Sequence, residues 1–307
     1  MAELVCCGEC LVDMVPDDRG CFCPHPGGAP ANVAVGAARL GLSTAFVGKR
    51  GDDAFGEILQ RYLEEGGVDT SGFSATREAL TALAFIQHRE GRVPEFRFYR
   101  SPGADELLRP QDFPARLLDG AKVFHFGSIS LYSEPSAGAT RAAADKVRAH
   151  GGLVSYDPNL RPALMETRPG ALEAARSAIG RAHVLKASSE ELVELSGHPA
   201  EERSLTFLFD HGIRLAAITR GPDGATLATA DARVDLPSEE VPVVDTTGAG
   251  DAFTAALLTG LLERDLGPED LARLDRDTLQ ALGHWANRVA ALATTQTGAT
   301  RGIGRPA

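Results

Sequence analysis

The sequence predicts an α/β fold in which a mainly parallel β-sheet is covered by helices on both faces. Short apolar segments alternate with helical segments through most of the 307 residues. The apolar segments are continuous rather than alternating in polarity, as expected for parallel strands that are buried on both sides. We find no internal repeat and no long linker, so we predict one large domain over residues 1–307.

The individual elements follow from local pattern. A helix rich in small residues is expected over residues 30–41, and an amphipathic helix that ends at glycine over residues 53–67. A third helix is expected over residues 136–152. Apolar runs predict strands at 4–9, 44–48, 121–127, 153–157, 182–187, 214–220 and 241–245.

Two segments, about 10–26 and 80–103, interrupt this rhythm. In both, polar and apolar residues alternate between turn-forming residues, which predicts short antiparallel strands. Such strands would form either a small lid outside the main sheet or two edge hairpins without a further role.

The charge balance excludes some classes of protein. The net charge is −11 and the pI about 5.2, without a cluster of Lys and Arg, which argues against a nucleic-acid partner. No apolar run is long enough to cross a bilayer. The first residues, MAELVCCGECLVD, lack the basic region of a secretory signal, so we expect a cytoplasmic protein without a membrane partner.

All cysteines lie near the start of the chain. Cys7 and Cys10 form a CxxC pattern, and Cys21 and Cys23 form a CxC pattern, while Cys6 stands beside Cys7. A zinc site or a redox pair is one interpretation. We favour reduced thiols in a strand and a nearby loop, because the chain has no second CxxC pattern.

The stretch DTTGAGDAF, residues 245–253, carries the clearest chemistry. It follows the strand expected at 241–245 and leads into a helix that begins near Asp251. Unpaired N–H groups and the dipole at a helix N-terminus bind anions, and glycine lets the anion approach the backbone. Asp251 should stay ionised there. It would either take a proton from an attacking hydroxyl or cap the helix.

Two familiar phosphate loops do not fit this stretch. It has no lysine for the pattern GxxxxGK[ST], and Phe253 stands where GxGxxG requires its last glycine. A second motif, PGGAPANVAVGAARLG, places Gly27 and Gly28 before a helix whose first turn holds Asn32. Adjacent glycines allow a small polar ligand to touch the backbone, and Asn32 offers both a donor and an acceptor. A plain loop before a tightly packed helix is the alternative.

Together the two motifs resemble the ribokinase family of ATP-dependent carbohydrate kinases, the PfkB type. GGAPANVAVGAARLG with AFVGKRGDDAFG is similar to the first family signature, and DTTGAGDAFTAALL to the second. The resemblance covers essentially the whole chain. GECLVDMVP, FRFYRSPGADELL, SYDPNLRP and LKASSEELVELSG further resemble bacterial fructokinases. The resemblance implies a three-layer α/β/α ribokinase-like fold with a small β lid.

The resemblance also implies roles for single residues. The catalytic group would be the base Asp251 with the anion-binding backbone of Gly248, Ala249 and Gly250. The sugar would be held by Asp13, Gly27, Gly28, Asn32, Arg100 and Arg161. The nucleotide would be bound by Lys186, Thr219, Gly221, Gly224 and Asn287. Metal ions would lie near Glu191, Asp245 and Thr247. The chain departs from the usual pattern at Ser188, where many relatives have Asn, and at Arg220, where an apolar residue is usual.

The implied reaction is transfer of the γ-phosphoryl group of ATP to a primary sugar hydroxyl, with D-fructose 6-phosphate as the expected product. Mg²⁺ would be required, K⁺ could assist through the loop of residues 294–300, and a homodimer could form through the lid. Related alternatives are 2-keto-3-deoxygluconate and a nucleoside as substrate. A sugar sensor without activity would not need Asp251, and a dinucleotide oxidoreductase would need the missing fingerprint.

Overall fold

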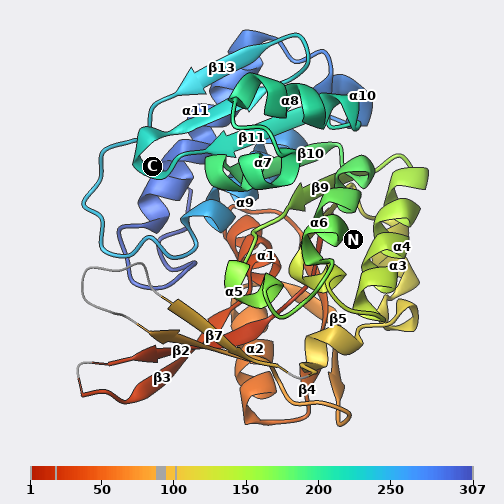
Figure 1. Ribbon diagram of the computed structural model, residues 1–307, viewed down its shortest axis with the longest axis vertical. Helices are drawn as coiled ribbons and strands as arrows, with labels where there is room; N and C mark the ends of the chain where they lie inside the picture. The colour runs from red at the N-terminus through yellow and green to blue at the C-terminus, as the bar shows by residue number, and fades with distance from the viewer. Residues whose placement is uncertain (1, 18, 88–94, 101, 306–307) are drawn as a thin grey trace.

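The computed structural model describes residues 2–17, 19–87, 95–100 and 102–305. In this part of the chain the larger sheet has nine strands, in the order β13-β12-β11-β10-β9-β8-β1-β4-β5 (Figure 1). From β11 to β5 in this order, each strand pairs with the next in parallel. β12 pairs antiparallel with both β11 and β13, so this edge of the sheet is antiparallel. The strands are β1 (Leu4–Cys7), β4 (Thr44–Gly51), β5 (Asp69–Thr76), β8 (Val123–Gly127), β9 (Leu153–Asp157), β10 (Val184–Ser188), β11 (Leu215–Thr219), β12 (Ala225–Ala228) and β13 (Arg233–Leu236).

Helices cover both faces of this sheet, as the continuous apolar strands predicted. One buried cluster joins strand residues to α1, α2, α9 and α11, and the other joins them to α3, α4, α6, α7 and α8. The α-helices are α1 (Ala29–Arg39), α2 (Ala54–Glu65), α3 (Ala115–Asp119), α4 (Ser136–Ala149), α5 (Pro162–Met165), α6 (Ala171–Ala178), α7 (Ser189–Ser196), α8 (Glu201–Asp210), α9 (Ala249–Glu263), α10 (Pro268–Leu271) and α11 (Arg276–Ala293). Short 3₁₀ turns are η1 (Ala104–Leu107), η2 (Pro110–Asp112), η3 (Ile129–Leu131), η4 (Ile179–Arg181) and η5 (Gly221–Asp223). The expected three-layer α/β/α architecture is confirmed.

A second, smaller sheet projects from the main body (Figure 1). Its strands are β2 (Leu11–Pro16), β3 (Phe22–Gly27), β6 (Leu83–Gln87) and β7 (Glu95–Tyr99), in the order β3-β2-β6-β7. Each of the two segments predicted from alternation forms an antiparallel pair, and β2 joins β6 in a parallel pair that local pattern could not reveal. Residues 18, 88–94 and 101 of these predicted segments lie outside the described residues.

One predicted strand is wrong. Residues 241–245 form no strand, although Val244 N and Asp245 N donate to the Thr294 carbonyl at 2.8 and 3.0 Å. Val243 and Val244 are 61% and 62% exposed, so the apolar run does not mark burial. The edge of the sheet beyond β11 is occupied by β12 and β13. These two strands, like β5, are not among the strands predicted from the sequence.

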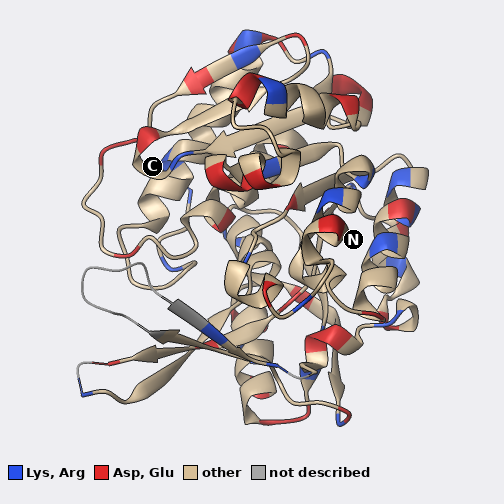
Figure 2. Cartoon of the chain, viewed as in Figure 1, with Lys and Arg blue, Asp and Glu red and all other residues tan. Residues whose placement is uncertain are grey.

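Charged residues of both signs are spread over the outer helices, and the view in Figure 2 shows no concentrated basic patch. Over the described ranges, no helix combines the length and apolar character needed to cross a membrane.

Candidate active site

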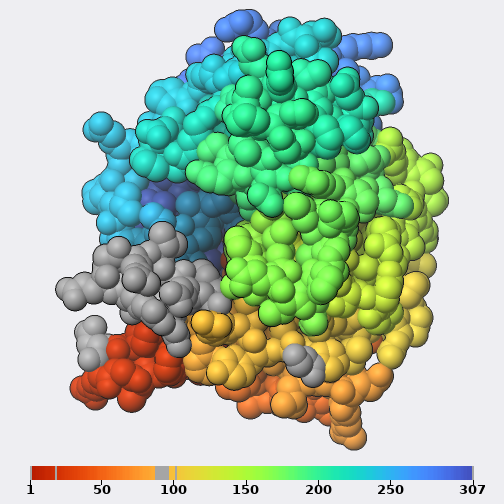
Figure 3. Space-filling view, in the orientation of Figure 1, coloured from red at the N-terminus to blue at the C-terminus, as the bar shows by residue number. Residues whose placement is uncertain are grey.

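The carboxyl ends of the parallel strands meet at one edge of the sheet, where ligands bind in open α/β folds. Asp157 ends β9, Ser188 ends β10 and Thr219 ends β11. The N-termini of α1 and α9, which carry the two glycine motifs, bring Asn32 and Asp251 together at 2.7 Å. Figure 3 shows the surface hollowed beside the segment that precedes α9, with atoms of the C-terminal part of the chain recessed inside the hollow.

Asp251 lies in the first turn of α9 but does not cap the helix. The N-cap residue is Gly248, and Asp251 is the third helical residue. Its Oδ2 accepts a hydrogen bond from Asn32 Nδ2 at 2.7 Å, and Asn32 Oδ1 in turn accepts one from the Tyr62 hydroxyl at 2.9 Å. The N-cap interpretation of Asp251 is therefore wrong, and its carboxylate is turned towards the glycine motif at the start of α1.

Burial changes the acidity of Asp251. The residue is 8% exposed, and desolvation raises its pKa to about 6. The hydrogen bond from Asn32 acts in the opposite direction and lowers this pKa. The charge of Asp157 raises this pKa further, while Lys186 and Arg161 lower it. The ionised form still predominates at neutral pH, as expected, although the pKa lies above that of an ordinary aspartate.

The glycines before and inside the first turn of α9 are required by close contacts. Gly248 has φ +79°, and a β-carbon there would lie 2.3 Å from the Ala299 carbonyl oxygen. A β-carbon on Gly250 would lie 2.8 Å from Lys186 Nζ. The Ala249 N–H donates to the Thr246 carbonyl at 3.2 Å, so this group, which we expected in the anion site, is engaged within the turn.

A buried ion pair lies next to this turn. Lys186 Nζ is 3.0 Å from Asp157 Oδ2, which also accepts a hydrogen bond from Thr254 at 3.3 Å. Burial alone would lower the pKa of Lys186, but Asp157 and Glu191 raise it above its ordinary value. The ammonium group is therefore a fixed positive charge beside Gly250. Asp157 was not among the predicted site residues, because its position became evident only when β9 and β10 were paired.

Several candidate sugar residues lie near Asp251. Gly27 ends β3, and a β-carbon there would lie 2.2 Å from Asp13 Oδ2. Burial raises the pKa of Asp13 to about 6, with Arg161 lowering and Asp251 raising it. Arg161 also lowers the pKa of Asp251, so Arg161 and Asp251 both lie within electrostatic range of Asp13, and Arg161 within that of Asp251. Gly28 has φ +111°, and a β-carbon there would collide with the Glu9 carbonyl oxygen at 2.4 Å.

Arg100 lies in a buried polar cluster. Its guanidinium is 2.5 Å from Asp105 and 3.7 Å from Glu106, while its Nε and Nη1 have no hydrogen-bond partner. Glu9 lies close enough for the charge of Arg100 to affect its pKa, which burial raises to about 7. Glu9 accepts a hydrogen bond from the Ala29 N–H at 3.3 Å with Oε1, and its Oε2 has no partner. Sequence reasoning missed Glu9; the signal was an acidic residue at the end of the apolar run at 4–9.

The candidate nucleotide residues form a separate group. A β-carbon on Gly224 would lie 2.0 Å from the Leu236 carbonyl oxygen, so the loop after β11 packs directly on the end of β13. Ser238 donates to the Pro222 carbonyl at 2.5 Å, and Asn287 of α11 donates to the Pro237 carbonyl at 2.8 Å. The loop with Thr219, Gly221 and Gly224 is thereby brought next to Asn287.

The residues expected near metal ions are tied to backbone N–H groups. Glu191 accepts from Leu160 N at 2.6 Å with Oε1 and from Ser188 N at 2.8 Å with Oε2, so it caps α7 together with Ser188. Asp245 accepts from Thr247 N at 2.9 Å and from Gly298 N at 2.8 Å, and so connects the segment before α9 with the C-terminal loop.

The cysteines divide into two groups. Cys6, Cys7 and Cys10 are buried, whereas Cys21 and Cys23 are exposed, and all are free thiols. Burial raises the pKa of Cys7 to about 12, and that of Cys6 and Cys10 rises as well. Within the described ranges, no group of three or more His, Cys, Asp or Glu residues is arranged to hold a metal.

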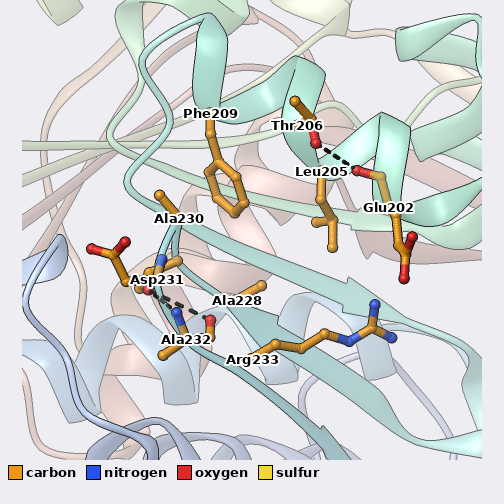
Figure 4. Close-up of a pocket in the computed structure, with 10 residues that line it drawn as sticks. Glu202, Leu205, Thr206, Phe209, Ala228, Ala230, Asp231, Ala232 and Arg233 are labelled. Carbon is orange, nitrogen blue, oxygen red and sulfur yellow. Dashed lines mark hydrogen bonds between the residues drawn. The ribbon is translucent and has the colours of Figure 1, made fainter.

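A pocket of about 290 Å³ lies apart from these residues, between α8 and the turn that joins β12 to β13 (Figure 4). Leu205, Phe209 and Ala228 supply apolar surface, and Glu202, Asp231 and Arg233 add charges. None of the predicted site residues lines it. It is therefore not the candidate active site.

Comparisons with known proteins agree on one family. A model of the pfkB family of carbohydrate kinases matches residues 1–304. The chain is similar to a protein of Arabidopsis thaliana named probable fructokinase-4, with 41% identity over 304 residues that cover 96% of this chain and 92% of the relative.

Solved structures give the same result. The chain resembles Xylella fastidiosa fructokinase with bound ATP, with a TM-score of 0.93, 32% identity and coverage of 99% of this chain and 96% of the other. It also resembles Vibrio cholerae fructokinase bound to fructose, ADP and calcium, with a TM-score of 0.87, 35% identity and coverage of 99% and 96%. A double mutant of the Vibrio enzyme, bound to fructose, ADP and potassium, gives a TM-score of 0.88 at 34% identity, again covering 99% and 96%.

Proposed function

Because the chain belongs to the pfkB family of carbohydrate kinases, we propose that it transfers the γ-phosphoryl group of ATP to a primary hydroxyl of D-fructose, giving D-fructose 6-phosphate. The observation that carries this proposal is the 2.7 Å hydrogen bond between Asn32 and Asp251. It joins the helix that follows the Gly27–Gly28 loop to the helix that begins at the anion-binding turn. A base held at this junction can act on a hydroxyl that lies against a phosphate.

Asp251 takes the proton of the attacking hydroxyl as the bond to phosphorus forms. Its pKa of about 6 leaves it mostly ionised at neutral pH and closer to that pH than an ordinary aspartate, which favours general-base catalysis. The backbone of Gly248 and Gly250 lies at the positive end of the α9 dipole, where it stabilises charge on the transferred group. The Ala249 N–H, which is bound to the Thr246 carbonyl, contributes less. Lys186 adds a fixed positive charge beside Gly250.

The nucleotide is ATP, held by the loop with Thr219, Gly221 and Gly224 and by Asn287. Mg²⁺ would neutralise charge on the phosphates of the bound nucleotide. The carboxylates of Asp157 and Glu191 would hold this ion through water, because carboxylate oxygens are typical Mg²⁺ ligands and both groups lie near Lys186. A monovalent cation, such as the potassium present in the related Vibrio structure, would bind near Asp245 and Thr247.

The sugar pocket favours a neutral ketohexose over a sugar acid. Asp13, Gly27, Gly28, Asn32 and Arg161 supply donors and acceptors for hydroxyl groups. Asp13 and Asp251 would also repel a carboxylate at close range, since like charges repel.

Further expectations accompany this function. The small sheet would act as a lid that excludes water, and its exposed Phe22 and Tyr99, 41% and 65% accessible, are compatible with contact to a second copy of the chain. The cytoplasmic location stays a prediction from the N-terminal sequence.

A substrate panel tests the proposal. ADP release is measured with fructose, 2-keto-3-deoxygluconate and a nucleoside at equal concentrations of ATP and Mg²⁺. We expect the highest kcat/KM with fructose. A higher kcat/KM for 2-keto-3-deoxygluconate or the nucleoside would contradict fructose as substrate, and no ADP release with any sugar would favour a sensor.

A further inference from the structure

A closed ring of polar contacts connects the loop after β11 to the edge of the main sheet. Arg220 Nη2 lies 2.6 Å from Glu201 Oε2, and Arg233 Nη2 lies 2.8 Å from Glu201 Oε1. Arg233 Nη2 is also 2.9 Å from Asp235 Oδ1. Thr226 completes the ring, because it donates to Asp235 Oδ1 and accepts from Arg220 Nη2 at 2.7 Å.

The members of this ring come from four places in the fold. Glu201 begins α8, Thr226 belongs to β12, and Arg233 and Asp235 belong to β13, while Arg220 directly follows β11. Thr226 is fully buried, and the side chains of Arg220 and Glu201 are each 25% exposed, whereas those of Arg233 and Asp235 are 39% and 61% exposed. Contacts that alternate in sign and are partly shielded from water are stronger than single exposed ion pairs.

The backbone of Arg220 closes the loop from the inside. Its N–H donates to the Gly224 carbonyl at 2.8 Å, and its carbonyl accepts from Asp223 N at 3.1 Å. Gly221 and Gly224 have positive φ values of +56° and +89°, so the loop contains flexible residues that cost entropy to order. Arg220 is thus fixed at its side chain by the ring and at its backbone by the loop.

We propose that Arg220 is a positioning residue, which through Glu201 and Thr226 holds the loop of residues 219–224 in the conformation that binds the nucleotide. The inference rests on the proposed function of this loop. It differs from the simpler idea that Arg220 binds a phosphate directly. The guanidinium Nη2 already contacts Glu201 and Thr226, and a loop ordered in advance binds its ligand with a smaller entropy loss.

A double-mutant cycle tests the inference. The variants are R220Q, E201Q and the double variant, each full length. Calorimetry measures the Kd of ATP with Mg²⁺, and steady-state assays measure KM for ATP and for fructose. We expect each single variant to weaken ATP binding about 3- to 10-fold, and the double variant to be no weaker than either one, because both remove the same contact. The KM for fructose should change less than about twofold.

Direct phosphate binding by Arg220 predicts a different result of the double-mutant cycle. E201Q would then free the guanidinium, so ATP binding would stay unchanged or become tighter, and only R220Q would weaken it. That result would overturn the inference, as would ATP binding that is unchanged in all variants. As a matched control, R116Q removes an exposed ion pair with Asp69 at 3.2 Å, outside the site, and should leave ATP binding unchanged.

Two further measurements keep the outcomes separate. Charge exchange in R220E/E201R should recover ATP affinity relative to R220E alone, and failure to do so in a variant with a normal thermal unfolding curve would count against the ring. If the unmodified protein binds ATP and shows the expected cycle but does not phosphorylate fructose, the substrate proposal fails and the inference stands. If the unmodified protein phosphorylates fructose but the variants show no coupling between Arg220 and Glu201, the inference fails and the substrate proposal stands.

Discussion

The sugar side and the nucleotide side of the candidate site differ in the chemical groups that form them. On the sugar side, Glu9, Asp13 and Asp251 are carboxyl groups whose pKa values burial raises to between about 6 and 7. Buried atoms of Glu9 and Arg100 there have no hydrogen-bond partner, and on the nucleotide side the same holds for Glu201 Oε1. On the nucleotide side, the contacts come from backbone groups, glycines and the partly exposed ring around Arg220.

This difference has consequences for stability as well as for catalysis. A carboxyl group whose pKa is raised by folding favours the folded state most when it is protonated, below its unfolded pKa of about 4. That contribution is lost as the pH rises through about 6 for Asp13 and Asp251, so both are ionised at neutral pH at a cost to stability. Substitutions and pH should therefore change turnover, fructose binding and stability strongly on the sugar side. Changes on the nucleotide side should alter ATP binding only weakly.

The largest effect is expected from Asp251→Asn. The amide keeps an oxygen that can accept from Asn32 but cannot take a proton, so kcat should fall by about 10² to 10⁴. Binding of fructose and ATP should largely persist, and the Tm at pH 8 should be equal or higher, because a buried charge is removed. Steady-state kinetics and calorimetry measure these quantities.

The control for this variant is Asp210→Asn, at the exposed end of α8, which should change neither kcat nor Tm. Nearly normal turnover of Asp251→Asn would mean that Asp251 is only structural and would remove the base from the mechanism.

Gly27→Ala should affect the sugar side but not the nucleotide side, because it introduces a steric clash with Asp13. The new β-carbon would lie 2.2 Å from Asp13 Oδ2, so the Asp13 carboxylate must move. Displacement of a substrate-binding group by about 1 Å can cost about 10²-fold, and we expect kcat/KM for fructose to fall by about 10- to 100-fold. The KM for ATP should change less than about twofold, because the loop after β11 is untouched.

Gly180→Ala is the matched control, since a β-carbon there meets nothing closer than 3.8 Å. Equal changes in the KM values for ATP and fructose in Gly27→Ala would show that the two sides are not independent.

The fold was largely predictable because buried parallel strands leave a direct trace in sequence. The apolar runs at 44–48 and 153–157 became β4 and β9. The equally apolar run at 241–245 did not become a strand, since hydrophobicity alone does not show whether a partner edge is free. Here β12 and β13 extend the sheet beyond β11, and Val243 and Val244 remain exposed.

The site was predictable only where one short motif contains the chemistry. The sequence indicated Asn32 and Asp251 separately, but their contact joins residues that are 219 positions apart. Asp157 and Glu9 were missed, because the properties of each depend on neighbours from other strands and helices. For Arg100 the sequence indicated the residue but not its pairing with Asp105.

The pH dependence of kcat/KM sharpens the comparison. In the free enzyme Asp251 and Asp13 both have pKa values of about 6, so kcat/KM for fructose should fall at least tenfold per pH unit well below pH 6. Arg161 lowers both pKa values, and Arg161→Gln should therefore move this acid limb to higher pH, besides weakening fructose binding. An acid limb that stays in place in Arg161→Gln would argue against the proximity of these charges.

The smallest effect is expected from the monovalent cation, which would act on the backbone next to the base. Burial alone would raise the pKa of Asp245, but the N–H groups of Gly298 and Thr247 lower it, so its carboxylate stays negatively charged. It connects the C-terminal loop to the turn before α9, where Gly248 packs on Ala299. A cation bound beside this carboxylate would hold the two segments together and order the anion-binding turn.

K⁺ should therefore raise kcat a few-fold over a large organic cation at the same ionic strength, which removes general salt effects from the comparison. Asp245→Asn should lose most of this difference, because a neutral amide attracts a cation less strongly. The KM for fructose should hardly respond, since Asp13 and Gly27 are not part of this connection. Equal rates in K⁺ and in the organic cation would show that the turn is already ordered by the hydrogen bonds of Asp245, and that the phosphate side of the site needs no ion to assemble.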